Sequence, residues 1–290
     1  MQFEGYMTLA AYAAVYLIWG STYLAIRVAV GGIPPLLLMG VRCTAAGALM
    51  LAWAGVRGER ATRDQWRHAA VAGGLMIAVT YGALGWAEQR LASGIAALLS
   101  ATSPLWLTTL DWRKSGRPTA TTLAGLALGI AGVAALVGAG APEGGNLTAA
   151  VVLIAGTAAW AAGSLYSRPP RLPRSIALGA GMPLVAGGMM LLAASIASGD
   201  ASRYDVHRAS HAALWALAYL IVFGSLVGFS AYAWLLRVAP ASRVGTHAYV
   251  NPLVAIALGW GIAGEPITAT TGVAAAMIAA SVAMVLKGGR

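Results

Sequence analysis

One face of the first long apolar segment carries side chains that could bind a small molecule. Tyr12, Tyr16, Trp19 and Tyr23 recur at i, i+4, i+7 and i+11, a spacing that places them on one side of a helix. Aromatic rings hold apolar groups and also accept cations on their faces. Tyr12 and Tyr23 are equally typical of an aromatic belt at a membrane surface. We therefore expect the deeper pair, Tyr16 and Trp19, to line a cavity.

The sixth apolar segment repeats part of this pattern. Trp160 and Ser164 stand at the same spacing as Trp19 and Tyr23 in the first segment. An internal repeat of this kind suggests two related halves. Trp19 and Trp160 are therefore candidates to face each other across an axis of pseudo-symmetry.

Polar side chains also occur in other apolar segments. His247 and Asn251 share a helix face, with Tyr249 beside them. An unpaired polar group is costly in hydrocarbon, so such residues should face protein or a water-filled cavity. For a single Ser or Thr, hydrogen bonding between helices is the competing explanation. The residues predicted to line a substrate cavity are Tyr16, Trp19, Tyr81, Thr102, Ser103, Trp106, Trp160, Ser164, Tyr232, His247, Tyr249 and Asn251.

Arg42 is the residue that is most expensive to place in a membrane, at about +2.5 to +3.5 kcal/mol near the bilayer centre. It can extend its head group toward the surface, pair with an acid, or bind an anionic group of a substrate. Glu88 is the one acid expected at a comparable depth. An Arg42–Glu88 pair is therefore one prediction of the sequence.

Two prolines, Pro104 and Pro252, fall inside apolar segments at equivalent places in the two halves. Proline removes a main-chain donor and kinks a helix, leaving a carbonyl free. A symmetric pair of kinks would suit a hinge that gates a pathway. It would equally suit a fixed bend, and both interpretations stay open.

The elements that must position these residues are membrane-spanning helices. The chain is 59% hydrophobic and 10% charged, and apolar runs of about 20 residues follow one another throughout. The single cysteine, Cys43, excludes an internal disulfide, and a cleavable signal peptide is not expected. The net charge of +10 does not indicate nucleic-acid binding, because the basic residues are scattered through loops.

Ten transmembrane helices are predicted. One set of loops and ends carries fourteen Lys and Arg residues and the opposite set carries four, which places both termini in the cytoplasm. The expected protein is thus an all-α, multi-pass protein of a bacterial inner membrane. The predicted spans are 8–29, 34–55, 68–88, 91–111, 119–139, 147–167, 175–198, 211–235, 241–263 and 268–286.

The chain also contains an internal duplication. Trp86 and Trp234, and likewise Pro104 and Pro252, coincide when one half is slid 148 residues onto the other. Each half, 1–140 and 147–290, holds five spans. Because five is odd, the second half enters the membrane from the opposite side. Inverted repeats are typical of transporters that alternate access around a site between the halves.

In these features the chain resembles the EamA-type permeases of the drug/metabolite transporter superfamily. The resemblance covers essentially the whole chain and departs from the family pattern where Gly116-Arg117-Pro118 replaces a typical Gly-Glu pair. It implies export of amino acids and related metabolites, with toxic organic compounds as further cargo. The motifs that carry it are Trp19-Gly20-Ser21, Pro35 to Arg42, Leu91 to Pro104, Ala239 to Pro252 and Gly264-Glu265-Pro266.

We therefore expect a carrier of small metabolites, most consistently amino acids including aromatic ones. Its partners would be that substrate and the lipid bilayer, and it would act as a monomer or homodimer. The sequence holds no HExxH, CxxC or P-loop motif, so neither an enzyme nor a cofactor or metal is expected. Facilitated transport is favoured, because every acidic residue is expected in a loop or near the end of a span. Proton coupling through His247, the one titratable group placed deep, is the second possibility. The alternatives are a proton-coupled multidrug exporter and a channel.

Overall fold

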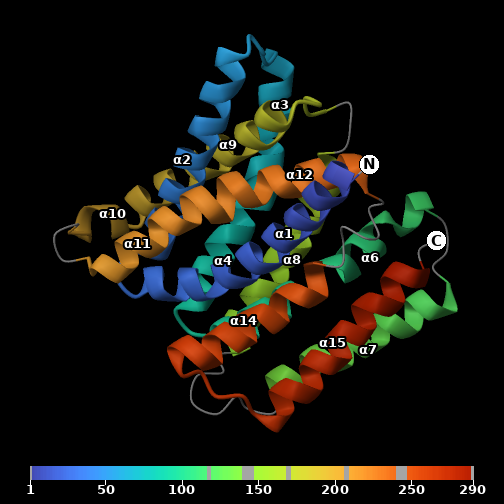
Figure 1. Ribbon diagram of the computed structural model, residues 1–290. Helices are drawn as coiled ribbons and strands as arrows, with labels where there is room; N and C mark the ends of the chain where they lie inside the picture. The colour runs from blue at the N-terminus through green and yellow to red at the C-terminus, as the bar shows by residue number, and fades with distance from the viewer. Residues whose placement is uncertain are drawn as a thin grey trace.

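The fold was examined in a computed structural model that describes residues 2–115, 119–138, 147–167, 171–205, 209–239 and 247–288. Every regular element in these residues is a helix, as predicted (Figure 1). The helices are α1 (Gln2–Val30), α2 (Pro35–Val56), α3 (Arg63–Gly73), η1 (Gly74–Val79), α4 (Thr80–Glu88), α5 (Ser93–Ser100), α6 (Ser103–Ser115), α7 (Ala120–Gly138), α8 (Leu147–Tyr166), α9 (Ile176–Ala197), α10 (Asp200–Arg203), α11 (His211–Tyr219), η3 (Leu220–Val227), α12 (Gly228–Val238), α14 (His247–Ala263) and α15 (Ala269–Gly288).

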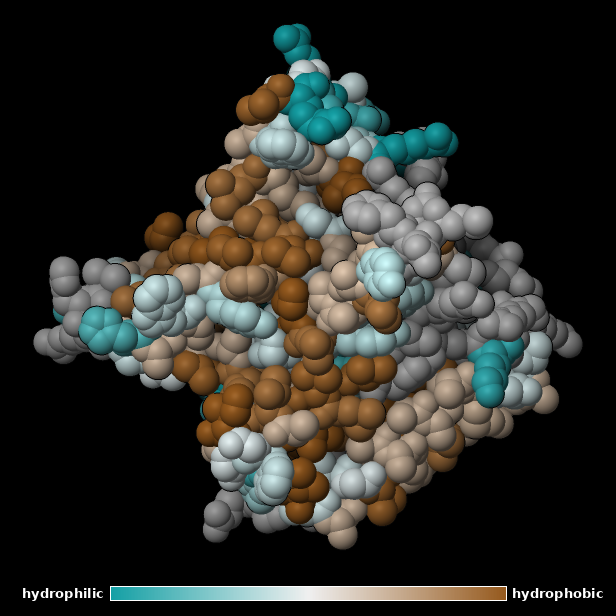
Figure 2. Space-filling view, in the orientation of Figure 1, coloured by the Kyte–Doolittle hydropathy of each residue, from teal (hydrophilic) through white to brown (hydrophobic). Residues whose placement is uncertain are grey.

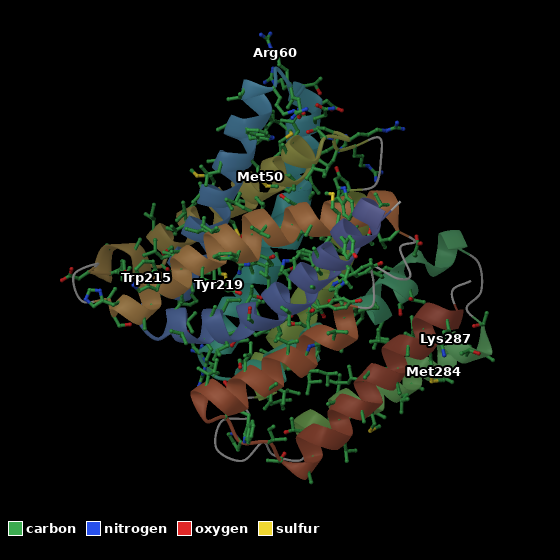
Figure 3. All side chains as sticks on the ribbon, in the orientation of Figure 1. Met50, Arg60, Trp215, Tyr219, Met284 and Lys287 are labelled. Atoms are coloured by element: carbon green, nitrogen blue, oxygen red, sulfur yellow. The ribbon has the colours of Figure 1, made fainter. Side chains whose placement is uncertain are left out.

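Six continuous helical stretches of the described chain are long and apolar enough to cross a membrane, and three shorter helices are also apolar. Large hydrophobic side chains such as Trp53, Ile196, Trp215 and Trp260 lie more than half exposed on the outer surface. Figure 2 shows hydrophobic residues spread across most of the visible face, with hydrophilic residues near its edges. Figure 3 places Arg60 at the tip beyond α2 and α3. A surface of this kind suits a lipid environment.

The helix boundaries can be compared at the offset of the predicted duplication. Helices α2 (Pro35–Val56) and α9 (Ile176–Ala197) are both 22 residues long and begin 141 positions apart. From the third span onward the offset is 148, since α3 begins at Arg63 and α11 at His211. The two halves therefore align at an offset of 141 over α2 and α9 and at an offset of 148 beyond them, whereas the sequence indicated the single offset of 148. The seven additional residues lie between α9 and α11, where α10 is inserted.

Helices of one half pack mainly against helices of the other half. The equivalent helices α2 and α9 form one extensive pair, and α7 and α15 form another, visible side by side in Figure 1. Helix α1 packs on α11, α12 and α14, while α8 packs on α4, α5 and α6. The first helix of each half is thus enclosed by the third and fourth spans of the opposite half.

Glycines allow α9 to lie close to its neighbours. A Cβ atom added at Gly187 would fall on the main-chain oxygen of Gly73 in α3 and on Ile77 in η1. One added at Gly188 would fall on Thr44 in α2. Small residues let helix backbones approach one another in membranes, where dispersion contacts replace the hydrophobic drive between helices.

The third and eighth spans each contain a π-helical turn, η1 and η3, at equivalent places in the repeat. The hydroxyl of Thr80, directly after η1, donates to the carbonyls of Leu75 and Gly156, both at 2.9 Å. The second of these bonds crosses to α8. Such turns are rare, and they occur often at functional sites because they disturb the regular main-chain bonding.

The amino end of α5 is held by an acid from the opposite half. The Glu265 carboxylate accepts hydrogen bonds from the Ser93 main-chain N–H and hydroxyl, both at 2.9 Å, and from the Gly94 N–H at 3.3 Å. Gly264 has a φ of +67° and ends α14, and the next N–H bonds back to the Gly259 carbonyl. This turn aims the carboxylate at donors that would otherwise lack partners.

Glu265→Ala is expected to lower the free energy of unfolding by about 1–2 kcal/mol, because it removes the acceptor that caps α5. Thermal unfolding in detergent would measure the loss. Asp64→Ala is the matched control, since the exposed Asp64 side chain makes only a surface pair with His68. Equal melting temperatures for the two variants would contradict this role of Glu265.

Candidate functional site

Trp19 of α1 lies at the centre of an aromatic cluster built with α12 and α14. Its ring contacts those of Phe229 and Tyr232 at centroid distances of 5.5 and 5.0 Å. The His247 ring meets it edge-on at 5.4 Å. Its indole N–H donates to the main-chain oxygen of Gly224, in the π turn η3, at 3.1 Å. The structure thus brings three of the predicted residues, Trp19, Tyr232 and His247, into one cluster.

The other half contains an equivalent but simpler pair. Trp160 of α8 stacks on Tyr81 of α4, with centroids 6.1 Å apart and planes 4° from parallel. Trp160 is the counterpart of Trp19 at the offset of 141, and Tyr81 is the counterpart of Phe229 at 148. Within the described residues, no ring contact joins Trp19 to Trp160. Each tryptophan instead packs on the third span of the opposite half, Trp19 on α12 and Trp160 on α4.

Arg42 is buried between these two groups, with only 3% of its surface exposed. Its Nε–H donates to the hydroxyl of Ser225 at 3.0 Å, and its guanidinium carbon lies 5.1 Å from the centre of the Tyr81 ring. No acid forms an ion pair with it in the described part of the chain. The equivalent residue of the second half is Pro183, so this charge is present on one side only.

The predicted Arg42–Glu88 ion pair is wrong. Arg42 reaches across to Ser225 in η3, whereas the Glu88 side chain is enclosed elsewhere, with none of its surface exposed. Arg27 of α1 donates through Nη1 to the main-chain oxygen of Glu88. The two residues were assigned a similar depth, but depth along a helix does not determine the direction in which a side chain points around it.

Two residues outside the predicted set complete this region. Ser225 is buried and is the hydrogen-bond partner of Arg42. Tyr23 packs against the same core as these helices, and its hydroxyl interacts with the side chain of Ser100. Ser225 was detectable as a polar residue in an apolar segment. Tyr23 was left open between an interfacial belt and a cavity, and the structure places it half-buried against the core.

Thr102 and Ser103, both predicted to line the cavity, make hydrogen bonds that stabilise the helices. The Thr102 hydroxyl donates to the Leu99 carbonyl at 2.6 Å and lies 3.3 Å from the Thr157 hydroxyl of α8. The Ser103 hydroxyl donates to the Ser100 carbonyl at 2.7 Å. These contacts agree with the competing explanation for a single Ser or Thr, namely hydrogen bonding within and between helices.

The remaining predicted residues lie in different places. Tyr16 packs with Trp19 and Tyr232 in one hydrophobic cluster. Trp106 and Ser164 are half-buried on α6 and α8. Asn251 is buried in α14, and its side-chain oxygen has no hydrogen-bond partner. The side chain of Tyr249 lies outside the described residues.

The two prolines occupy different local structures. Pro104 stands in the first turn of α6, just after a break at Ala101–Thr102 that divides the predicted fourth span into α5 and α6. Proline is well tolerated there, since that position needs no main-chain donor. Pro252 lies within the continuous helix α14. The two prolines therefore differ in local structure, and their role as a hinge stays a prediction.

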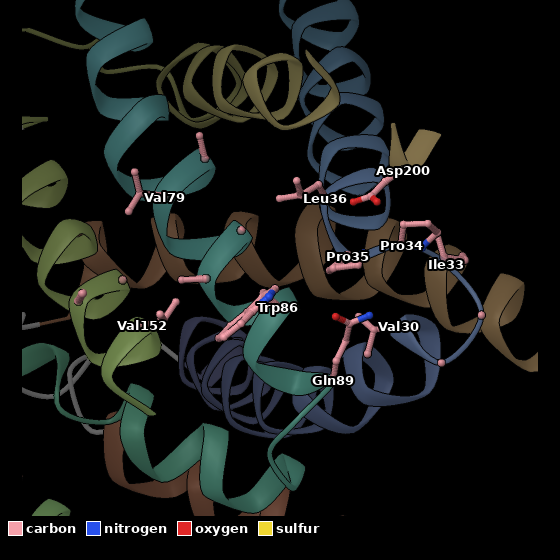
Figure 4. A pocket seen from close by; sticks show the side chains of 17 residues that line it. Val30, Ile33, Pro34, Pro35, Leu36, Val79, Trp86, Gln89, Val152 and Asp200 are labelled. Atoms are coloured by element: carbon pink, nitrogen blue, oxygen red, sulfur yellow. The ribbon is translucent and has the colours of Figure 1, made fainter. Parts of the chain in front are cut away.

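An open pocket of about 880 Å³ lies between the α1–α2 turn, α4 and α8 (Figure 4). Trp86, Gln89 and Asp200 contribute its larger polar or aromatic side chains. The Arg90 guanidinium covers the Trp86 ring at 3.9 Å. The pocket lining contains none of the residues predicted to bind substrate.

Comparisons with known proteins connect this architecture to a family. The EamA-like transporter family model matches residues 6–138 and 147–287. The chain is 35% identical to the uncharacterized inner membrane transporter YedA of Escherichia coli (strain K12), over 99% of this chain and 94% of that protein. It is 24% identical to the uncharacterized transporter YvbV of Bacillus subtilis (strain 168), over 94% and 89% respectively. A solved crystal structure at 22% identity covers 98% of the chain with a TM-score of 0.68 and supports the fold.

Proposed function

Because the chain belongs to the EamA-like transporter family, we propose that it carries small metabolites across the inner membrane and that amino acids, aromatic ones included, are its main substrates. The resemblance noted in the sequence is thereby confirmed at the level of the family. The relatives in Escherichia coli and Bacillus subtilis are themselves named as transporters. The substrate class is what the family resemblance implies, and the chemistry around Arg42 supports it.

The observation that carries this proposal is a buried arginine without an acidic partner, next to stacked aromatic rings. In the described chain, the Arg42 guanidinium has Ser225 as its one oxygen partner, which leaves donors for an anionic group. A carboxylate is matched to a guanidinium in both charge and geometry. The adjacent Tyr81–Trp160 stack offers apolar faces to a substrate side chain. An amino acid combines these two chemical features.

We further propose that the chain has ten spans arranged as two inverted five-helix repeats, 1–140 and 147–290, with both termini in the cytoplasm. The matched helix pairs α2–α9 and α7–α15 support a two-fold relation between the halves. The excess of basic residues on one set of loops supports the orientation. In this arrangement the substrate would bind between the halves, which would rock to expose it to either side in turn.

Uptake of labelled amino acids into proteoliposomes tests the proposed function. We expect saturable uptake that is stimulated by unlabelled substrate on the opposite side, which is the behaviour of a carrier. A panel of labelled compounds should include amino acids with and without an aromatic side chain, and analogues that lack the carboxylate. The compounds that are taken up would define the substrate class. Ion currents without saturation would instead indicate a channel. Equal uptake of compounds with and without the carboxylate would exclude the role given to Arg42.

His247→Phe is expected to retain transport with an unchanged pH profile. Phenylalanine keeps a ring against Trp19 and Tyr232, contacts worth about 0.5–1.5 kcal/mol, but it cannot titrate. His247→Ala should weaken transport, because it removes the ring. Uptake measured across a range of pH compares the two variants. A shifted profile in His247→Phe would instead assign proton coupling to this histidine.

A further inference from the structure

Glu88 is a fully enclosed carboxylate. It is the last residue of α4, none of its surface is exposed, and neither carboxylate oxygen has a hydrogen-bond partner among the described residues. Most buried polar groups in proteins are hydrogen-bonded, and a buried charge is normally paired. No structural role of the side chain explains this placement, because the contact from Arg27 goes to the main-chain oxygen.

The ionisable groups around Glu88 come from three segments. Arg27 and Tyr23 lie on α1, and Glu265 lies in the connection between α14 and α15. Arg27 favours a negative charge on Glu88, but it forms no ion pair with that side chain. Glu265 is occupied by three hydrogen bonds at the amino end of α5, and a carboxylate bound in this way is stable in its charged form.

An ionised Glu88 would therefore be a desolvated charge next to another carboxylate. A protonated carboxyl group avoids most of this cost, because it is neutral. If the protein opened and let water reach Glu88, the charged carboxylate would become the favoured form. Water would stabilise the carboxylate, and Arg27 could then compensate its charge. Whether the Glu88 side chain is more stable with or without its proton thus depends on its access to water.

Building on the proposed transport function, we propose that Glu88 is the proton-binding site of the transport cycle and that substrate movement is coupled to proton movement through it. The carboxyl group keeps its proton while it is enclosed. When the protein opens, the O–H bond breaks, the proton passes to water, and the carboxylate remains beside Arg27. Return to the enclosed state requires a proton to be taken up again.

Infrared spectroscopy of the purified protein tests the proton site without any substrate. The unmodified protein should show the carbonyl stretch of a protonated carboxyl group at neutral pH, and Glu88→Gln should lose it. Glu59→Gln is the matched control, because the partly exposed Glu59 accepts a bond from Ser175 and should not contribute to the band. A band that is absent in the unmodified protein, or that survives in Glu88→Gln, would overturn the proposal.

A transport experiment separates this proposal from the proposed function. A pH gradient should stimulate uptake of a labelled amino acid by the unmodified protein, and Glu88→Gln should lose that stimulation while retaining substrate exchange at equal pH. Exchange in both proteins without any effect of the gradient would refute proton coupling and leave the transporter function intact. If no amino acid is carried, the substrate assignment fails, and the infrared result still decides whether Glu88 binds a proton.

Discussion

Replacement of Arg42 by alanine is expected to reduce uptake of a carboxylate-bearing substrate by about ten- to a hundredfold. Hydrogen bonds to a charged group contribute about 1.5–3 kcal/mol, and each 1.4 kcal/mol corresponds to a factor of ten in affinity. The loss should appear mainly in the concentration needed for half-maximal uptake. Folding should persist, because the substitution removes a buried charge that has no acidic partner in the described chain.

Arg57→Ala provides the matched control for this experiment. Arg57 follows α2, its side chain is 61% exposed, and it makes a long pair with Glu59 and a surface contact with the Trp53 ring at 6.0 Å. Its removal should leave uptake unchanged. Uptake of a substrate analogue without the carboxylate should differ little between Arg42→Ala and the unmodified protein. Equal loss for both compounds would show that Arg42 supports the structure rather than the substrate.

Gly187→Ala is expected to destabilise the protein by about 1–3 kcal/mol, the usual range for an overpacked core. The added methyl group would fall on the main chain of Gly73, which cannot move aside as a flexible side chain can. Helix α9 would have to separate from α3, and this displacement would also disturb its contact with α2. Thermal unfolding and size-exclusion chromatography in detergent would measure the effect.

Gly55→Ala makes the same chemical change in the same kind of element. Outside the adjoining turns of α2, no described part of the chain lies within 4 Å of the added Cβ position at Gly55. Alanine favours a helix over glycine by about 0.5–1 kcal/mol, so this variant should be as stable as the unmodified protein or slightly more stable. If the two variants unfolded alike, close backbone contact at Gly187 would not matter for stability.

The helices could be predicted well from the sequence because hydrocarbon imposes a simple rule. An apolar run of sufficient length has to satisfy its main chain internally, so the edges of α2 and α9 fall within a residue or two of the predicted spans. The fourth span was harder to predict. A break at Ala101–Thr102 leaves composition almost unchanged, and only Pro104 pointed to an irregularity there.

The site was less predictable, because it depends on how helices face one another. Sequence spacing identified Trp19 and Trp160 as equivalent, but packing joins each to the opposite half. It identified Arg42 and Glu88 as costly residues but assigned them to each other. The π turns gave no signal, since nothing in the composition of Gly74–Val79 distinguishes it from an α-helix. Direction around a helix axis is the information that one sequence lacks.

The π turns also determine how the two predicted halves can be compared. A π turn spreads its main-chain hydrogen bonds over one residue more than an α turn. The two spans that contain η1 and η3 begin 148 residues apart, at Arg63 and His211, and the same offset still holds beyond the turns at Trp86 and Trp234. Both spans thus accommodate the additional residue in the same place. The difference between Arg42 and Pro183 therefore lies next to main chains whose irregular turns coincide.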